Sequence, residues 1–151
     1  MPALSKQAAD ALYNHLLRNI TFASPANVYL AMHASGGTDP VHPGKIAASV
    51  FANEVSYSGY QRQQLTFAAP TGTENATGQT ATAVTFPELG SAATAFHVTG
   101  LSLWTLERAG TVGASGILLA AAPVDVAKLM EPGDVPLVAA GSILATFGQE
   151  L

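Results

Sequence analysis

The residues of this chain that could do chemistry are few, and their spacing matches no recognised arrangement. His33, Asp39 and His42 flank a Gly-rich turn, where imidazole and carboxylate groups could together ligate a metal ion. Their spacing follows no known ligand pattern, so we expect them to be polar loop residues. The chain contains no Cys, which excludes disulfide bonds and Cys-based zinc sites. We therefore predict no metal site and no cofactor.

A hydrolase would need a nucleophile, a general base and an orienting group held in register. Ser56, His97 and Asp134 supply these residue types, but many other combinations in the chain do so equally well. No G-x-S-x-G elbow, Walker loop or H-E-x-x-H motif is present. The run Gly113-Ala114-Ser115-Gly116 lacks the Lys and the following amphipathic helix of a phosphate loop. The sequence thus predicts no catalytic residues and no enzyme activity.

The chain is poor in charge. Charged residues make up 11% of its 151 residues and hydrophobic residues 48%. A soluble monomer usually carries about 25% charged residues, so this composition favours a surface that neighbouring subunits cover. The alternative is a monomer coated with Thr, Ser, Gln and Asn. A net charge of −4 argues against nucleic-acid binding, and no apolar run reaches the roughly 20 residues that span a membrane.

Hydrophobic periodicity predicts one N-terminal helix followed by short strands. The helix spans residues 5–17, with Ser5 as N-cap and with Ala9, Leu12 and Leu16 recurring at helical spacing. It packs either on the edge of its own sheet or on a partner. Alternating or apolar runs predict strands at 27–34, 61–67, 80–86, 95–105, 117–122, 135–139 and 142–147. Gly100 should mark a bulge, because the alternation restarts out of phase after it.

The remaining segments are predicted to connect these elements. Residues 35–51 form a long loop, 70–79 an exposed loop, and 124–130 a helical turn or an irregular edge. Glu131-Pro132-Gly133-Asp134 is a strong turn signal. The fold class is therefore mainly β: an antiparallel β-sandwich or barrel of about seven to nine short strands. Residues 1–151 form one domain, whose β part covers 27–34 and 57–148.

Three stretches in a fixed order carry a resemblance to a known family. They are E-V-S-Y-S-G-Y-Q-R-Q at 54–63, A-V-T-F-P at 83–87, and P-G-D at 132–134 followed by A-A-G at 139–141. This order resembles small virion proteins of tailed bacteriophages, which are labelled tail fibre or head decoration proteins. Tyr57 and Ser58 stand where the family has two glycines, and residues 39–53 are longer and more apolar than usual. The resemblance implies an all-β structural protein of the virion, without catalysis.

Two functions are compatible with these observations. We favour a capsid decoration (cement) protein that stabilises the assembled head shell, with the major capsid protein and copies of itself as partners and a trimer as its oligomer. The alternative is a tail fibre or tail-tip module that binds a host receptor. The predicted interface residues are Leu12, Leu16, His42, Ile46, Val50, Phe51, Tyr57, Tyr60, Arg62 and Trp104.

Three of these residues have an alternative structural role. Tyr60 could pack over the end of the sandwich while Arg62 is solvated, and Trp104 could be a core or rim aromatic.

Overall fold

The computed structural model describes residues 3–23, 25–34, 54–72, 76–107 and 116–147. The long loop predicted at 35–51 therefore lies outside the described residues. Within them the fold is mainly β with one N-terminal helix, as predicted. The elements are β1 (Ala3–Leu4), α1 (Lys6–Leu17), β2 (Val28–Ala34), β3 (Gln63–Leu65), β4 (Ala76–Gln79), β5 (Val84–Thr85), β6 (Phe96–Trp104), β7 (Leu118–Met130), β8 (Leu137–Val138) and β9 (Leu144–Phe147).

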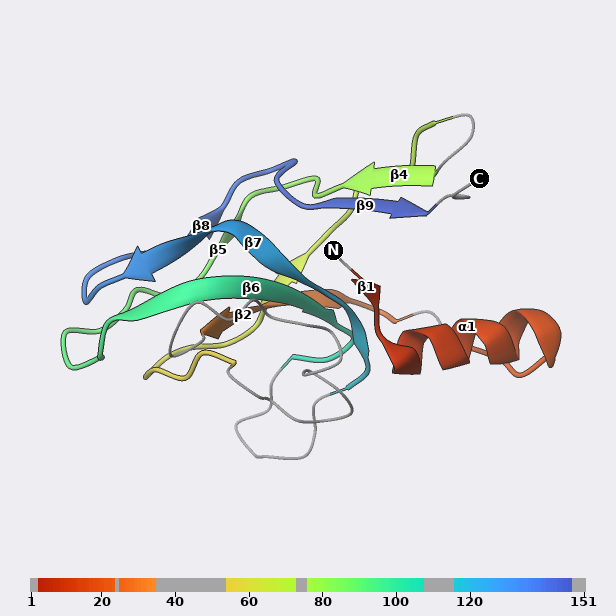
Figure 1. Cartoon of the computed structure of the whole chain (residues 1–151), viewed down its shortest axis with the longest axis horizontal. Helices are drawn as coiled ribbons and strands as arrows, with labels where there is room; N and C mark the ends of the chain where they lie inside the picture. Colours follow the sequence, from red (N-terminus) through yellow and green to blue (C-terminus); the bar gives the residue numbers. More distant parts are fainter. Residues whose placement is uncertain (1–2, 24, 35–53, 73–75, 108–115, 148–151) are drawn as a thin grey trace.

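The first layer is a five-stranded sheet in the order β1-β7-β6-β2-β3, in which every neighbouring pair is antiparallel. Its centre is the long pair β6 and β7, which Figure 1 shows crossing the molecule. Residues directly opposite each other in antiparallel strands share a face of the sheet. Leu30 pairs with Leu103 on one face, and Tyr29 pairs with Trp104 on the other.

The second layer is one interrupted ribbon, in which residues 76–89 run antiparallel to residues 133–147. Its two ladders are β4 with β9 and β5 with β8. Backbone hydrogen bonds between the ladders continue the same pairing, from Thr80 N to Ile143 O (3.1 Å) and from Phe86 N to Pro136 O (2.9 Å). On its other side β4 is bonded to the segment that follows β3, through Ala68 N to Gln79 O (2.8 Å). The chain after β3 thus passes from one layer to the other.

The main hydrophobic core lies between these two layers. It is a cluster of buried side chains to which the sheet contributes Leu30, Met32, Leu65, Val98 and Met130, and the ribbon contributes Val84, Phe86 and Leu89. Burying apolar surface on one face of each layer is what holds two sheets together. Of the two predicted architectures, the structure is therefore the antiparallel sandwich.

Helix α1 is anchored at its first turn and projects from the sandwich (Figure 1). Ser5 is the N-cap, as predicted: its Oγ accepts a hydrogen bond from Ala8 N (3.0 Å) and donates one to Leu118 O. Ser5 N also donates to Leu119 O on β7 (2.9 Å). The helix ends where Asn19 adopts a positive φ of 53°, a conformation that Asn tolerates better than most residues. In the described part of the chain, no helix is long and apolar enough to cross a membrane.

Two predicted connections are strands in the structure. The exposed loop predicted at 70–79 contains β4, which forms because β9 supplies its hydrogen-bonding partner. The segment 124–130 belongs to β7, so the predicted helical turn is wrong and the irregular edge is confirmed. Between the pairs Gly100–Pro123 and Val98–Lys128, four residues of β7 face one residue of β6. These four residues form a bulge of β7, whereas the bulge predicted at Gly100 is the extra residue Thr99 of β6, which lies between the pairs His33–Gly100 and Ala34–Val98 that β6 makes with β2.

Candidate functional site

The structure describes six of the ten predicted interface residues, and these six lie in three different environments. The other four, His42, Ile46, Val50 and Phe51, lie outside the described residues and stay predictions. Leu12 is half-buried and Leu16 exposed on α1, and Tyr57 and Tyr60 are half-buried against the core. Arg62 and Trp104 are interior side chains, 1% and 0% exposed. The prediction that these two contact a partner is therefore corrected to a structural role.

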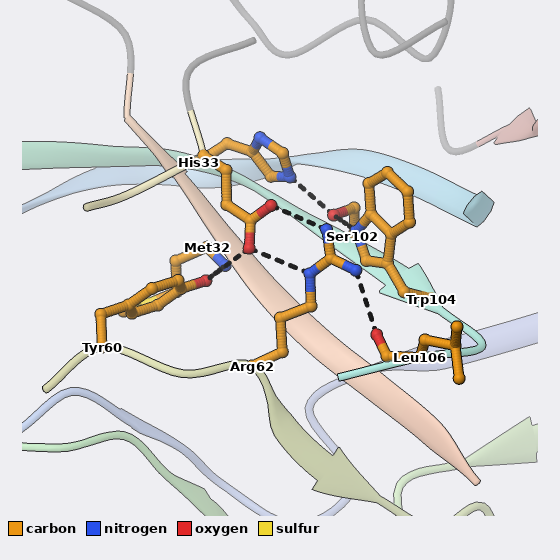
Figure 2. A network of polar contacts seen from close by, with 8 residues as sticks. Met32, His33, Tyr60, Arg62, Ser102, Trp104 and Leu106 are labelled. Carbon is orange, nitrogen blue, oxygen red and sulfur yellow. Dashed lines mark hydrogen bonds and ion pairs between the residues drawn. The ribbon is translucent and has the colours of Figure 1, made fainter. Parts of the chain in front are cut away.

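Arg62 forms a buried ion pair with Glu54 (Figure 2). Its Nε donates to Glu54 Oε1 at 3.0 Å and its Nη2 donates to Glu54 Oε2 at 2.8 Å. Both side chains are fully shielded from solvent. The remaining terminal nitrogen, Nη1, donates to the carbonyl oxygen of Leu106 at 3.0 Å. Two parallel hydrogen bonds to one carboxylate fix the guanidinium plane as well as compensating its charge.

The guanidinium plane in turn lies over Trp104, with Arg62 Cζ 3.9 Å from the ring centroid. This is a cation–π contact in a site without solvent, where such contacts are strongest. Trp104 Nε1 donates to Ser102 Oγ at 2.7 Å, and Ser102 Oγ lies 2.6 Å from His33 Nε2. A chain of polar contacts therefore runs from Glu54 through Arg62 and Trp104 to His33. We call these residues, with Ser102 and Tyr60, the buried polar network.

Tyr60 closes this network on the core side. Its hydroxyl accepts a hydrogen bond from Met32 N (3.1 Å) and donates one to Glu54 Oε1 (3.3 Å). Its ring lies parallel to that of Phe86 in the core, with the centroids 6.0 Å apart. Burial, and to a lesser degree the Glu54 carboxylate, raises the pKa of the Tyr60 hydroxyl far above its usual range. The phenol is therefore neutral and serves as a hydrogen-bond donor to Glu54.

The network contains a Ser–His contact, the pairing that activates a nucleophile in hydrolases. Here both side chains are buried, and Ser102 Oγ also accepts a hydrogen bond from Trp104. The geometry thus uses the hydroxyl to join two side chains and presents it to no substrate. Among the residues that the structure describes, no three His, Cys, Asp or Glu side chains gather where they could hold a metal ion.

The structural work of the network is to join distant parts of the chain. Glu54 forms an isolated antiparallel bridge with His33 at the end of β2, and Val55 N donates to Met32 O (3.0 Å). Arg62 connects this point to Leu106, beyond the end of β6. Sequence reasoning did not identify Glu54 as the partner of Arg62. The available signal was two opposite charges eight residues apart, at the start and near the end of the first family-like motif.

Outside this buried network, helix α1 carries an exposed apolar surface. Four large side chains at and just beyond its C-terminal half are widely exposed: Tyr13 (58%), Leu16 (73%), Leu17 (70%) and Ile20 (47%). Contiguous exposed apolar side chains of this kind mark interaction surfaces on soluble proteins. We call these four residues the α1 apolar surface. It contains Leu16, which was predicted as a contact, and adds three neighbours that were not.

The comparisons with known proteins agree with this picture of a structural protein. No curated protein matches the chain. A family model described as podophage GP4 fiber I protein gp80 matches residues 3–146, which is nearly the whole chain and spans both layers of the sandwich. The resemblance to phage virion proteins that the three sequence stretches carry is thereby confirmed. The chain belongs to the podophage GP4 fiber I protein gp80 family, a family of phage virion fibre proteins.

Proposed function

We propose that this protein is a non-catalytic structural subunit of a fibre on a phage particle. The observation that carries the proposal is the match of a fibre-protein family over residues 3–146. Two features of the structure support it. The charged groups in the interior are engaged in the buried polar network, and the widely exposed apolar residues of α1 lie on an element that projects from the sandwich.

Within such a fibre, the sandwich would act as a rigid unit. The buried polar network ties the ends of β2 and β6 to the start of β3, so that the three strands resist separation. Buried networks of this kind are costly to break, because separating the partners leaves a charge without compensation in the interior. Rigidity suits a module that transmits force or holds a fixed spacing.

A receptor-binding role for the aromatic residues receives no support from their geometry. Trp104 is buried, and Tyr57 donates its hydroxyl to the Pro87 carbonyl oxygen at 2.7 Å. Tyr60 is engaged with Met32 and Glu54. These contacts favour structural roles for Tyr57, Tyr60 and Trp104 over contacts with a host receptor.

Decoration of the head shell is the second candidate function. One observation favours it: with only 11% charged residues, the surface is suited to burial between subunits of a lattice. Many weak copies that bind the assembled shell, and not its separate subunits, would stabilise that shell by mass action.

Quantitative mass spectrometry of purified particles, with heads separated from tails, distinguishes the two candidates. A fibre subunit is expected at low copy number relative to the major capsid protein. A copy number close to that of the capsid protein, in the head fraction, would overturn the fibre proposal in favour of decoration. Absence from washed particles would overturn both.

A further inference from the structure

His33 is the member of the buried polar network whose residue type changes its charge near neutral pH. Its side chain is shielded from solvent, and its Nε2 lies 2.6 Å from Ser102 Oγ (Figure 2). A Ser hydroxyl has one proton to donate and two lone pairs that accept, whereas an indole N–H can only donate. One lone pair of Ser102 Oγ therefore accepts the proton of Trp104 Nε1, at 2.7 Å.

These contacts decide where the proton of the Ser102 hydroxyl goes. In the described part of the chain, Ser102 Oγ has two hydrogen-bonding neighbours, Trp104 Nε1 and His33 Nε2, and Ser102 is 1% exposed. Because Trp104 donates, the hydroxyl proton is donated to His33 Nε2. An imidazole ring that accepts a hydrogen bond through Nε2 is neutral and carries its proton on Nδ1. The hydrogen bonds thus hold His33 in one neutral tautomer.

A second proton on this ring would be unfavourable for two reasons. Nε2 would become a donor, so the Ser102 hydroxyl would lose its acceptor in the interior, and a buried donor without a partner is costly. The added charge would also lack compensation. The segment before β3 brings Glu54 and Arg62, which already pair with each other, and Tyr60, which is neutral. From β6 come Ser102 and Trp104, which carry no charge.

We propose that His33 is a pH-sensitive switch in the sandwich. While its ring is neutral, it holds the end of β2 to β6 through Ser102, and a second proton on Nε2 breaks that contact. The backbone of His33 also forms the bridge with Glu54, whose carboxylate carries the ion pair with Arg62. Mild acid therefore loosens the sheet at the point where the segment before β3 is attached to it. This inference goes beyond the fibre assignment and does not depend on it.

Proton linkage gives the sign and the size of the effect. A His in an unfolded chain takes up a proton near pH 6.5, roughly, whereas His33 Nε2 in the folded protein is occupied by the Ser102 proton. The unfolded state then binds more protons, so the folded state loses stability as the pH falls below about 6.5. The equilibrium constant for unfolding should rise up to about tenfold per pH unit. Unfolded carboxylates take up protons nearer to about pH 4, so the range above about pH 5 isolates the His contribution.

The test is urea unfolding of the purified full-length chain between about pH 7.5 and about pH 5, followed by Trp104 fluorescence and circular dichroism. The informative variant is His33→Gln, because the amide oxygen of Gln can accept the Ser102 proton at every pH and the amide does not titrate. This variant should abolish the rise of the unfolding constant, whatever its own stability at neutral pH. His97→Gln is the matched control: His97 is exposed on β6 and lies outside the buried polar network, so the rise should persist.

A second measurement does not require any variant to fold. Nitrogen-15 NMR of the unaltered chain distinguishes a ring nitrogen that carries a proton from one that does not, and for His33 we expect the proton on Nδ1 at neutral pH. A proton on His33 Nε2 at neutral pH, an unfolding constant that does not change with pH, or an equal rise in His33→Gln would each overturn the inference. Because both measurements use the isolated chain, their failure leaves the assignment to a phage fibre untouched, and that assignment is tested separately on particles.

Discussion

Breaking the buried ion pair from one side should be among the most damaging single changes in this protein. In Arg62→Met, the Glu54 carboxylate loses both hydrogen bonds from the guanidinium and keeps the longer one from Tyr60. An uncompensated buried charge costs about 3–5 kcal/mol. The loss of the cation–π contact with Trp104 adds to this cost, and desolvated contacts of that kind contribute about 2 kcal/mol. We therefore expect at least about 4 kcal/mol of destabilisation.

A loss of this size is a large part of the total stability of a domain, which is about 5–15 kcal/mol. For a chain of this length it corresponds to a fall in Tm of roughly 10 °C. Urea unfolding followed by circular dichroism measures the free-energy change. Fluorescence gives a second probe, because Trp104 is the only Trp and lies under the guanidinium.

A double-mutant cycle with Glu54→Leu separates the ion pair from the packing around it. Glu54→Leu alone leaves the guanidinium buried without its carboxylate and should cost a similar amount. The double variant Arg62→Met/Glu54→Leu leaves neither charge, so it should be more stable than either single variant. Single variants that each cost less than about 1 kcal/mol, or costs that simply add, would show that the pair behaves like a solvated surface pair and would refute this reasoning.

Three further predictions follow from individual contacts. The pKa of Tyr60 in the folded protein lies above its ordinary value of 10.0. Because the phenol ionises above pH 10.0 in the unfolded chain but stays neutral in the folded one, the free energy of unfolding should fall as the pH rises above 10.0. Tyr60→Phe should reduce this fall in unfolding curves measured at several alkaline pH values. Ser5→Ala removes the N-cap of α1 and its contact with β7, and should cost about 1–2 kcal/mol in urea unfolding. Gly133→Ala should lower stability by roughly 1–2 kcal/mol because of its φ of 94°, whereas Gly90→Ala, equally free of steric contact and without a positive φ, should be near neutral; equal effects would contradict the backbone explanation.

The elements that the sequence predicted correctly are those whose cause is local. The N-cap hydroxyl of Ser5 and the apolar residues that follow it lie within a few turns of one helix. The turn at 131–134 depends on Gly133 and on the bond from Asp134 N to Glu131 O (3.0 Å). The bulge in β6 was visible because an alternation of period two shifts phase at Gly100.

The elements that were missed, or for which two alternatives stayed open, depend on partners far along the chain. β4 is a short stretch of Ala, Thr, Gly and Gln with no hydrophobic pattern, and it is a strand because β9 and the segment after β3 supply its hydrogen bonds. The end of β7 likewise continues as a strand because β6 pairs with Lys128, Leu129 and Met130. Neither pairing can be predicted from the local sequence, because the hydrogen bonds between strands are made by the backbone and almost any residue type can take part in them.

The candidate site likewise has features that the sequence predicted and features that only the tertiary structure decided. The composition of the chain indicated a structural role, and three motifs indicated its family. Helical spacing placed Leu16 on the apolar face of a helix that packs either on its own sheet or on a partner. Tertiary structure decided that Arg62 and Trp104 are interior residues and that α1 projects. The physical reason is that periodicity, capping and turn chemistry act over a few residues, whereas burial depends on which distant groups arrive beside a side chain. A Glu and an Arg eight residues apart can form a solvated ion pair or a buried bidentate one. Which of the two forms depends on whether the tertiary structure buries both side chains, as it does here.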